Sequence, residues 1–182
     1  MRLHGIVSGG QSGVDRGALD AALAENWPCS GWCPAGRLAE DGSIPERYPL
    51  TELPVADYPA RTRRNVVDSD GTLIITAGPL TGGTRLTREI CRETGRPCLE
   101  LRADKLTTDR AARAALEFTR ASGIGRLNVA GPRLSDWPGG QAYARQVVAA
   151  LIALIQAEDS RSSPVSEDRD VIGGEQVEPR QM

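Results

Sequence analysis

Three short segments of the sequence combine glycine with hydroxyl side chains, a combination that suits the binding of phosphate. They are residues 8–15 (SGGQSGVD), residues 78–84 (GPLTGGT) and residues 131–140 (GPRLSDWPGG). Glycine lets the backbone come close to a ligand, and a helix N-terminus presents free N–H groups at the positive end of its dipole. If the fold brings the three segments together, they predict a site for an anionic ligand.

Apolar patterning predicts a strand directly before each of these segments and a helix after the first two. These strands are residues 3–8, 71–77 and 127–130, and these helices are residues 14–25 and 86–94. Further strands are predicted at 29–33, 50–53 and 98–101, further helices at 60–68, 109–121 and 142–156, and an ordered loop at 34–47. The alternation predicts one α/β domain, Rossmann-like, with a mostly parallel open sheet and helices on both faces. Loops after parallel strands share the carboxyl edge of such a sheet, where ligands bind.

The candidate ligand-binding residues all come from these segments and the helices that follow them. They are Gly9, Gly10, Gln11, Ser12, Gly13, Asp15, Arg16, Gly82, Gly83, Thr84, Thr87, Gly131 and Arg133. The glycine-rich helix starts supply N–H groups, and the planar guanidinium of Arg133 adds positive charge. Structural roles stay open for some of these residues, since Ser12 and Asp15 can instead form a capping box. Trp32 and Trp137 lie near the loops and can either stack on a flat ligand or only pack.

Several kinds of catalytic site are excluded by residue counts. His4 is the single histidine and Lys105 the single lysine, so His-rich zinc sites, His-Glu-x-x-His proteases and a Gly-Lys phosphate loop are absent. The four cysteines, Cys29, Cys33, Cys91 and Cys98, have no Cys-x-x-Cys spacing. This pattern favours reduced thiols, with zinc bound by all four as the alternative, and no metal-binding residue is predicted.

Charge divides the chain into two parts. Residues 157–182 hold seven acidic residues and three arginines, a charge of −4, so residues 1–156 carry +2 of the total of −2. Residues 1–156 are therefore predicted to form the ligand-binding domain, and the polar residues 157–182 a disordered acidic tail. The nearly neutral domain argues against nucleic acid as a partner, because nucleic-acid binding requires a basic face.

The sequence further predicts a cytoplasmic protein with no membrane segment. The first apolar stretch stops at Gly9-Gly10, which is too early for a signal peptide, and the run near residues 147–155 is too short to span a bilayer. The helix at 142–156 has a wide apolar face, from which a homo-oligomer is expected.

A set of ordered motifs resembles a known family. These motifs are GGQSGVDR (9–16), GWCPAGR (31–37), AEDG (39–42), Arg61-Thr62 with Asn65-Val66, DSDGTLI (68–74), GGT (82–84) and NVAGPR (128–133). Over about residues 5–156 the chain resembles the molybdenum cofactor carrier proteins, the circularly permuted branch of the SLOG superfamily, which is related to the cytokinin-activating phosphoribohydrolases.

The resemblance implies a carrier or storage protein for molybdenum cofactor or a related phosphorylated pterin, with a molybdoenzyme as a recipient. Two alternatives are an N-glycosidase of nucleoside monophosphates, acting through a carboxylate such as Asp15 or Asp41, and a nucleotide-sensing module. The hydrolases carry Gly-Gly-x-Gly-Thr-x-x-Glu, and Thr87 stands here at the position of that glutamate, while Glu89 and Glu93 are displaced along the helix. Binding is therefore favoured over turnover, because glycosidic cleavage ordinarily uses carboxylates.

Overall fold

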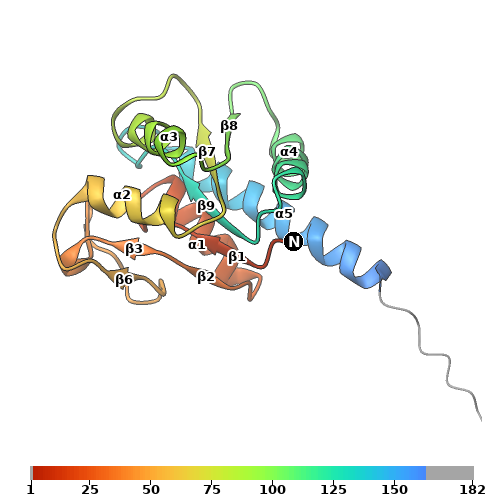
Figure 1. Cartoon of the computed structure of the whole chain (residues 1–182), viewed down its shortest axis with the longest axis horizontal. Coiled ribbons are helices and arrows are strands. Elements are labelled where there is room, and N and C mark those ends of the chain that lie inside the picture. The colour runs from red at the N-terminus through yellow and green to blue at the C-terminus, as the bar shows by residue number, and fades with distance from the viewer. Residues whose placement is uncertain (1, 163–182) are drawn as a thin grey trace, which may run out of the picture.

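A computed structural model describes residues 2–162 of the chain (Figure 1). Its main sheet has five parallel strands in the order β2-β1-β9-β7-β8. They are β1 (Gly5–Val7), β2 (Cys29–Ser30), β7 (Gly71–Thr76), β8 (Cys98–Arg102) and β9 (Arg126–Ala130). In this order β9 lies between β1 and β7, with Ile6 opposite Leu127 and Leu73 opposite Val129. The three strands that precede the glycine-containing segments are thus direct neighbours.

Helices cover both faces of this sheet, as Figure 1 shows. They are α1 (Val14–Ala24), α2 (Tyr58–Val67), α3 (Gly82–Thr94), α4 (Thr108–Ala121) and α5 (Gly140–Ser162). The core on one face joins α1, α4 and α5 to the sheet through side chains such as Ile75, Val129 and Val148. On the other face α2 and α3 pack together around Val66 and Ile90. The α/β, Rossmann-like architecture predicted from the sequence is confirmed.

The segment between β1 and α2 is more structured than predicted. The predicted strand at 29–33 divides into β2 and β3 (Trp32–Cys33), and β3 pairs with β6 (Thr51–Glu52) in a separate parallel ribbon. The break falls at Gly31, where a Cβ atom would lie 1.9 Å from the carbonyl oxygen of Ser8. The predicted loop contains the short helix η1 (Ala35–Arg37) and a hairpin of β4 (Leu38–Ala39) and β5 (Gly42–Ser43).

The last helix extends six residues beyond its predicted end at Gln156 and reaches Ser162. Ion pairs from Arg2 to Asp159 and from Arg120 to Glu158 tie this last part of α5 to the rest of the domain. The predicted boundary of the tail at residue 157 is therefore too early. The remainder of that prediction, for residues 163–182, lies outside the described residues.

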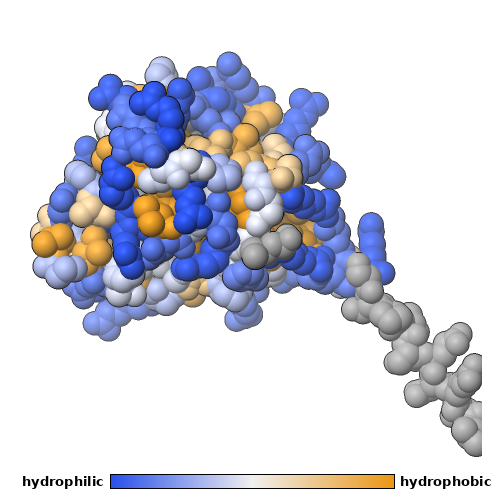
Figure 2. Space-filling view, viewed as in Figure 1, coloured by the Kyte–Doolittle hydropathy of each residue, from blue (hydrophilic) through white to orange (hydrophobic). Residues whose placement is uncertain are grey.

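The apolar face of α5 is covered within the chain. Ala144, Val147, Leu151 and Ile152 are fully buried, and α5 packs against α1 and α4. This removes the reason for expecting an oligomer. Hydrophilic residues cover most of the face seen in Figure 2, with smaller apolar areas between them. None of the helices within residues 2–162 has the length and apolar content to span a bilayer.

Candidate functional site

The loops after β1, β7 and β9 surround a cavity of about 390 Å³, together with residues of α2 and α3. Nine of the thirteen candidate residues line it. They are Gly9, Gln11, Asp15, Gly82, Gly83, Thr84, Thr87, Gly131 and Arg133. The neighbouring positions of β1, β9 and β7 in the sheet therefore bring all three segments to one site.

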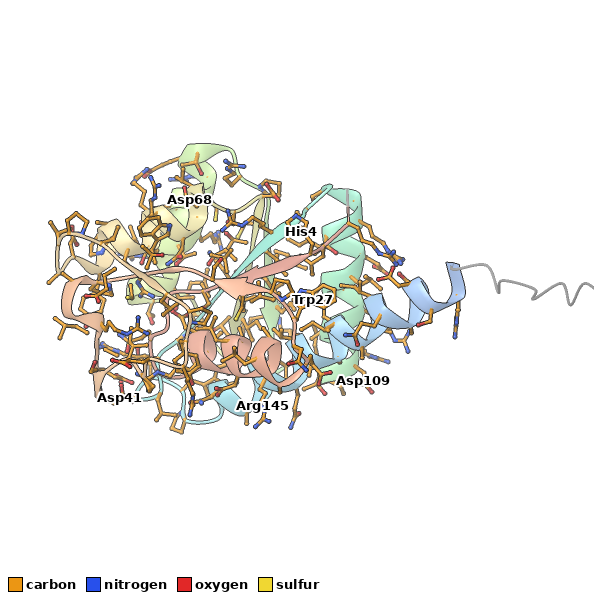
Figure 3. All side chains as sticks on the ribbon, turned by 90° about the horizontal axis from the view of Figure 1, so that it is seen from below. His4, Trp27, Asp41, Asp68, Asp109 and Arg145 are labelled. Atoms are coloured by element: carbon orange, nitrogen blue, oxygen red, sulfur yellow. The ribbon has the colours of Figure 1, made fainter. Side chains whose placement is uncertain are left out.

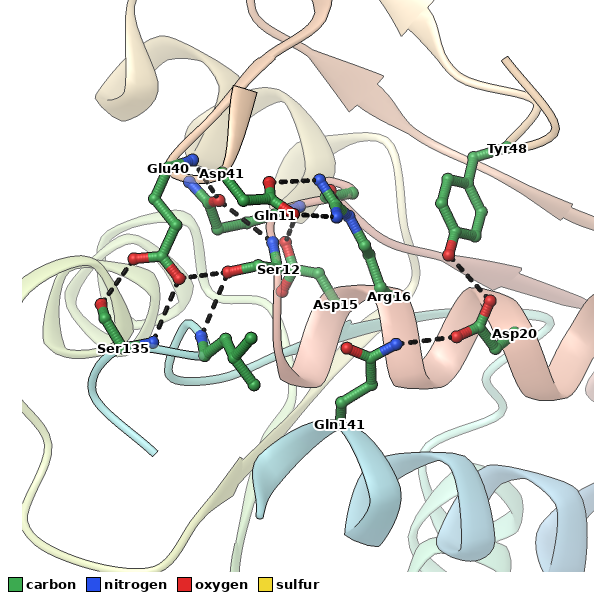
Figure 4. A network of polar contacts seen from close by, with 12 residues as sticks. Gln11, Ser12, Asp15, Arg16, Asp20, Glu40, Asp41, Tyr48, Ser135 and Gln141 are labelled. Carbon is green, nitrogen blue, oxygen red and sulfur yellow. Dashed lines mark hydrogen bonds and ion pairs between the residues drawn. The ribbon is translucent and has the colours of Figure 1, made fainter. Parts of the chain in front are cut away.

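The other four candidates, Gly10, Ser12, Gly13 and Arg16, do not line the cavity and instead hold the loops together. Figure 4 shows the polar contacts of Ser12 and Arg16. Arg16 donates to both oxygens of Asp41, at 2.5 and 2.8 Å, and its Nε donates to the Gly10 carbonyl at 3.1 Å. Ser12 donates its hydroxyl to Glu40 and accepts the N–H of Leu134 at 3.1 Å. Gly13 packs directly against the backbone of residues 132–134. These four residues fix the positions of the loops that form the cavity wall.

The N-terminus of α3 opens into the cavity. The N–H groups of Thr84 and Arg85 both donate to the Thr81 carbonyl at 3.1 Å, whereas those of Gly82 and Gly83 have no acceptor within residues 2–162. Space around Gly83 is free, since a Cβ atom there would meet nothing within 4 Å. The first turn carries no acidic residue. An anion placed here would receive two N–H groups and the positive end of the helix dipole.

The N-terminus of α1, by contrast, already has internal partners. The N–H of Ser12 donates to the Gln11 side chain at 3.0 Å, and the N–H of Val14 donates to the Pro132 carbonyl at 3.2 Å. The Asp15 carboxylate accepts the N–H of Gln11 at 3.3 Å. The two helix starts predicted as equal phosphate sites therefore differ, because several donors around the start of α1 have internal acceptors, whereas the N–H groups of Gly82 and Gly83 at the start of α3 have none within residues 2–162.

A buried ion pair lies beside the first loop. Arg61 of α2 donates to Asp15 at 2.8 Å, and the two side chains are only 13% and 7% exposed. Burial raises the pKa of Asp15, against the opposing effects of the Arg61 charge and of N–H donors from Gln11 and Gly9. The guanidinium lies directly on Gly9, where a Cβ atom would be 1.7 Å from Nη1, so any larger residue at this position would push the Arg61 side chain away. Asp15 is therefore engaged in an ion pair with Arg61 and does not form the capping box with Ser12 that the sequence left open.

Arg61 is a site residue that is missing from the sequence prediction. Arg61 belongs to a helix rich in arginine, and arginines in such a helix usually lie on a face exposed to solvent. The one signal in the sequence that points to the site is its place in the motif Arg61-Thr62 with Asn65. Other lining residues missing from the prediction come from four separate parts of the chain. They are Glu40, Tyr58, Pro59, Thr62, Asn65, Thr81, Leu86, Asn128, Ala130, Pro132 and Asp136.

Glu40 joins the hairpin to the first and third loops. It accepts the Ser12 hydroxyl, the Ser135 hydroxyl and the Ser135 N–H. Burial acts to raise the pKa of Glu40, but these hydrogen bonds outweigh it and hold the pKa below its ordinary value. Arg133 lies 3.5 Å from Glu40 and 3.2 Å from Asp136, and half of its side chain is exposed. The charge of Arg133 is therefore shared with two carboxylates before any ligand binds.

The residues considered for hydrolysis are not arranged as an acid–base pair. Thr87 donates its hydroxyl to the Gly83 carbonyl at 2.9 Å, while Glu89 and Glu93 pair with arginines outside the cavity. Asp41 is held by Arg16 and does not line the cavity. Figure 3 shows Asp41 far from His4, the single histidine, which precedes β1 at the opposite edge of the sheet. Within residues 2–162 Asp15 is the one candidate carboxylate of the enzyme hypothesis that reaches the cavity.

Neither tryptophan near the loops reaches the cavity. Trp32 donates its Nε1 to Asp68 at 2.8 Å beneath the guanidinium of Arg64. Trp137 packs against Tyr143 with the ring centroids 5.8 Å apart. Of the two roles left open for Trp32 and Trp137, packing is the one observed. The four cysteines are free, and residues 2–162 contain no group of three or more potential metal ligands.

Comparison with known proteins identifies the family of this chain. Residues 6–152 match the model of the Circularly permutated YpsA SLOG family. The fold is similar to the crystal structure of a protein from Syntrophus aciditrophicus SB named "Putative molybdenum carrier protein", with a TM-score of 0.80 and 42% sequence identity. The match covers 82% of this chain and 95% of that one. No curated protein matches the chain. The extent of the family match and this level of identity show that the chain belongs to the circularly permuted YpsA family of SLOG proteins.

Proposed function

We propose that this protein binds a phosphorylated small molecule in the cavity, and that the molecule is molybdenum cofactor or a related pterin. In this proposal the protein is a cytoplasmic carrier or store that hands its cargo to a molybdoenzyme. Family membership supports a ligand-binding role. The name of the similar Syntrophus protein supports molybdenum as part of the cargo.

One observation carries the proposal: the first N–H groups of α3 have no acceptor within residues 2–162. The free N–H groups of Gly82 and Gly83, and the hydroxyl of Thr84 beside them, suit a terminal phosphate. The volume of about 390 Å³ lies within the usual range for small-molecule sites. Tyr58, Pro59 and Leu86 add an apolar wall for a flat ring system.

The lining residues also agree with a metal that arrives as part of its own organic ligand. No cysteine or histidine is among the cavity residues in the described chain. A bare molybdenum ion would lack soft or imidazole ligands from the protein, whereas the cofactor holds its metal through its own dithiolene sulfurs. The protein's task in the proposal is to bind the phosphate and the ring.

The experiment that tests the proposal identifies the ligand directly. The full chain, produced in a host that makes molybdenum cofactor, is purified without oxygen and its bound small molecules are measured by mass spectrometry. The expected result is a phosphorylated pterin or its oxidised derivative, bound in a fixed ratio to protein. A calorimetric titration of ligand-free protein with molybdenum cofactor then gives the affinity. Absence of binding in both measurements would refute the proposal.

Buried Asp15 supports a second candidate, hydrolysis of the N-glycosidic bond of nucleoside monophosphates. A carboxyl group whose pKa burial raises, inside a ligand cavity, is a typical candidate for acid–base catalysis. Incubation with AMP distinguishes the two functions, since repeated release of adenine that Asp15→Asn abolishes would establish the enzyme.

A further inference from the structure

An asparagine in the middle of the sheet lies against the ligand cavity. Asn128 belongs to β9, where its neighbours Leu127 and Val129 point into the core formed with α1, α4 and α5. Because side chains alternate along a strand, Asn128 points to the opposite face of the sheet, the one covered by α2 and α3. Residues of both helices line the cavity together with Asn128, of which only 2% is exposed.

The side-chain amide of Asn128 has a protein partner on one side only. Its Nδ2 donates to the Thr72 hydroxyl at 3.2 Å, and Thr72 is the residue directly opposite in the register of β9 and β7. Its Oδ1 accepts no hydrogen bond from any group within residues 2–162, and it is not one of the unpartnered atoms that are sealed inside this part of the chain. The oxygen therefore faces the cavity, and the bond to Thr72 holds it in that orientation.

A second asparagine of the cavity lining, Asn65 of α2, shows the difference. Its Oδ1 accepts the N–H of Trp32 at 2.8 Å and its Nδ2 donates to the Trp32 carbonyl at 3.0 Å, so both ends of this amide serve the fold. Asparagine is uncommon inside strands, yet Asn128 stands in the middle of one. No group of the fold within residues 2–162 uses the Asn128 oxygen, which points to a ligand that supplies a donor.

The rest of the cavity indicates which group of a ligand donates to this oxygen. The start of α3 offers N–H donors, whereas Asn128 offers an acceptor. An ionised phosphate has only acceptor oxygens, so it suits α3 and does not suit Asn128. The apolar wall that contains Tyr58 and Leu86 favours a flat ring. An amino group on such a ring donates in the plane of the ring, as the amino group of adenine does to an asparagine side chain.

We propose that Asn128 determines the specificity of the cavity for the ring of the ligand, with its Oδ1 accepting an N–H of an exocyclic amino group. The ligand class is then an aminated nitrogen heterocycle joined to a phosphate, which includes both pterins and adenine nucleotides. Since the bond to Thr72 fixes which amide atom meets the ring, a ring without the amino group leaves the oxygen unpaired. This inference rests on the proposed function for the position of the phosphate.

Matched pairs of ligands test this assignment by calorimetric titration of the full chain. One pair is a pterin monophosphate and the same compound without its 2-amino group, and the other is AMP and purine riboside 5′-monophosphate, which lacks the 6-amino group. In at least one pair we expect the aminated ligand to bind about tenfold to a hundredfold more tightly, because its partner leaves a buried acceptor without a donor. The pair that shows this preference identifies the ring as pterin or purine. Equal affinities within both pairs, or no binding of either pair, would overturn the proposal.

Variants of Asn128, checked for folding by urea unfolding, separate recognition from a structural role. Asn128→Leu removes the acceptor, so the affinity ratio within the pair should fall to about one, whereas a purely structural role would weaken both ligands equally. Asn128→Asp keeps an oxygen acceptor, to which Thr72 can donate its hydroxyl, so the preference should remain even where the added charge weakens both ligands. Thr119→Val is the matched control, a buried polar residue of α4 outside the cavity lining, and should leave the ratio unchanged. A preference that persists in folded Asn128→Leu protein, or is lost in folded Asn128→Asp protein, would contradict the assignment.

Titration with molybdenum cofactor separates this inference from the proposed function. We expect the cofactor to bind the natural protein about tenfold to a hundredfold more tightly than Asn128→Leu protein. If it binds both proteins equally, the assignment of Asn128 is wrong and the proposed function stands. If it binds neither, but the AMP pair shows the amino preference, the proposed function fails and the assignment of Asn128 stands.

Discussion

Gly83→Asp provides a strong test of the ligand placement, because it should affect stability and binding in opposite directions. Gly83 has open space around its Cα atom and its φ is not positive, so aspartate fits there without strain. An acidic residue in the first turn of a helix contributes about 0.3–1 kcal/mol through the dipole. Loss of a helical glycine adds up to about 1 kcal/mol. The variant should therefore be as stable as the natural protein, or more so.

Binding should nevertheless weaken strongly. Two unit charges about 4 Å apart repel by about 4 kcal/mol at an effective dielectric constant of about 20, the value typical near a protein surface. Since the cavity is open to solvent, we expect about 2–4 kcal/mol, a loss of about thirtyfold to a thousandfold in affinity for a phosphorylated ligand.

The assay pairs urea unfolding with calorimetric titration of molybdenum cofactor. Gly78→Asp is the matched control, since it places the same charge in the same loop, also in open space, but outside the cavity lining. It should bind nearly as tightly as the natural protein. Unchanged affinity in folded Gly83→Asp protein would remove the α3 N-terminus from the site and refute the reasoning.

Four further outcomes follow from the same structure. Thr84→Ala should weaken binding of the phosphorylated ligand about tenfold to a hundredfold in calorimetry, the loss of one charge-assisted hydrogen bond, and a smaller change than twofold would contradict a contact with phosphate. Because the pKa of Glu40 is lowered, the stability that its charge contributes is present above its unfolded pKa and is lost as the pH falls through the folded value. Glu40→Gln should therefore be less stable than the natural protein at pH 7, and urea unfolding should show this difference shrinking as the pH falls through the folded pKa of Glu40. A chain ending at Gln156 loses the exposed ion pairs of Glu158 and Asp159, worth about 0–1 kcal/mol each, and its melting temperature should drop by only a few degrees in calorimetry. Incubation with AMP should release no adenine over many turnovers, since Thr87 stands where the related hydrolases carry a glutamate, and steady release would reverse that assignment.

Much of this protein was readable from local patterns in its sequence. Short apolar runs that end at glycine predicted the strands β1, β7 and β9, and helical periodicity predicted the five α-helices of the described chain to within a few residues at most of their ends. The glycine-rich start of α3 indicated an anion site, because a free helix N-terminus and close backbone approach are local properties. The end of α5 was misjudged because ion pairs to Arg2 and Arg120, distant in sequence, extend that helix.

Which donors remain available to a ligand was decided by the tertiary structure alone. The sequence presents α1 and α3 as equal helix starts, but Pro132, Gln11 and Asp15 accept several of the N–H groups around the start of α1. Arg61 becomes a site residue because α2 packs it onto Gly9. The positive charge of Arg133 is less available to a ligand because the Glu40 carboxylate lies beside it. All of these contacts join residues far apart in the chain. They depend on the order β1-β9-β7, which hydrophobic periodicity cannot specify, because every order of buried parallel strands has the same apolar pattern.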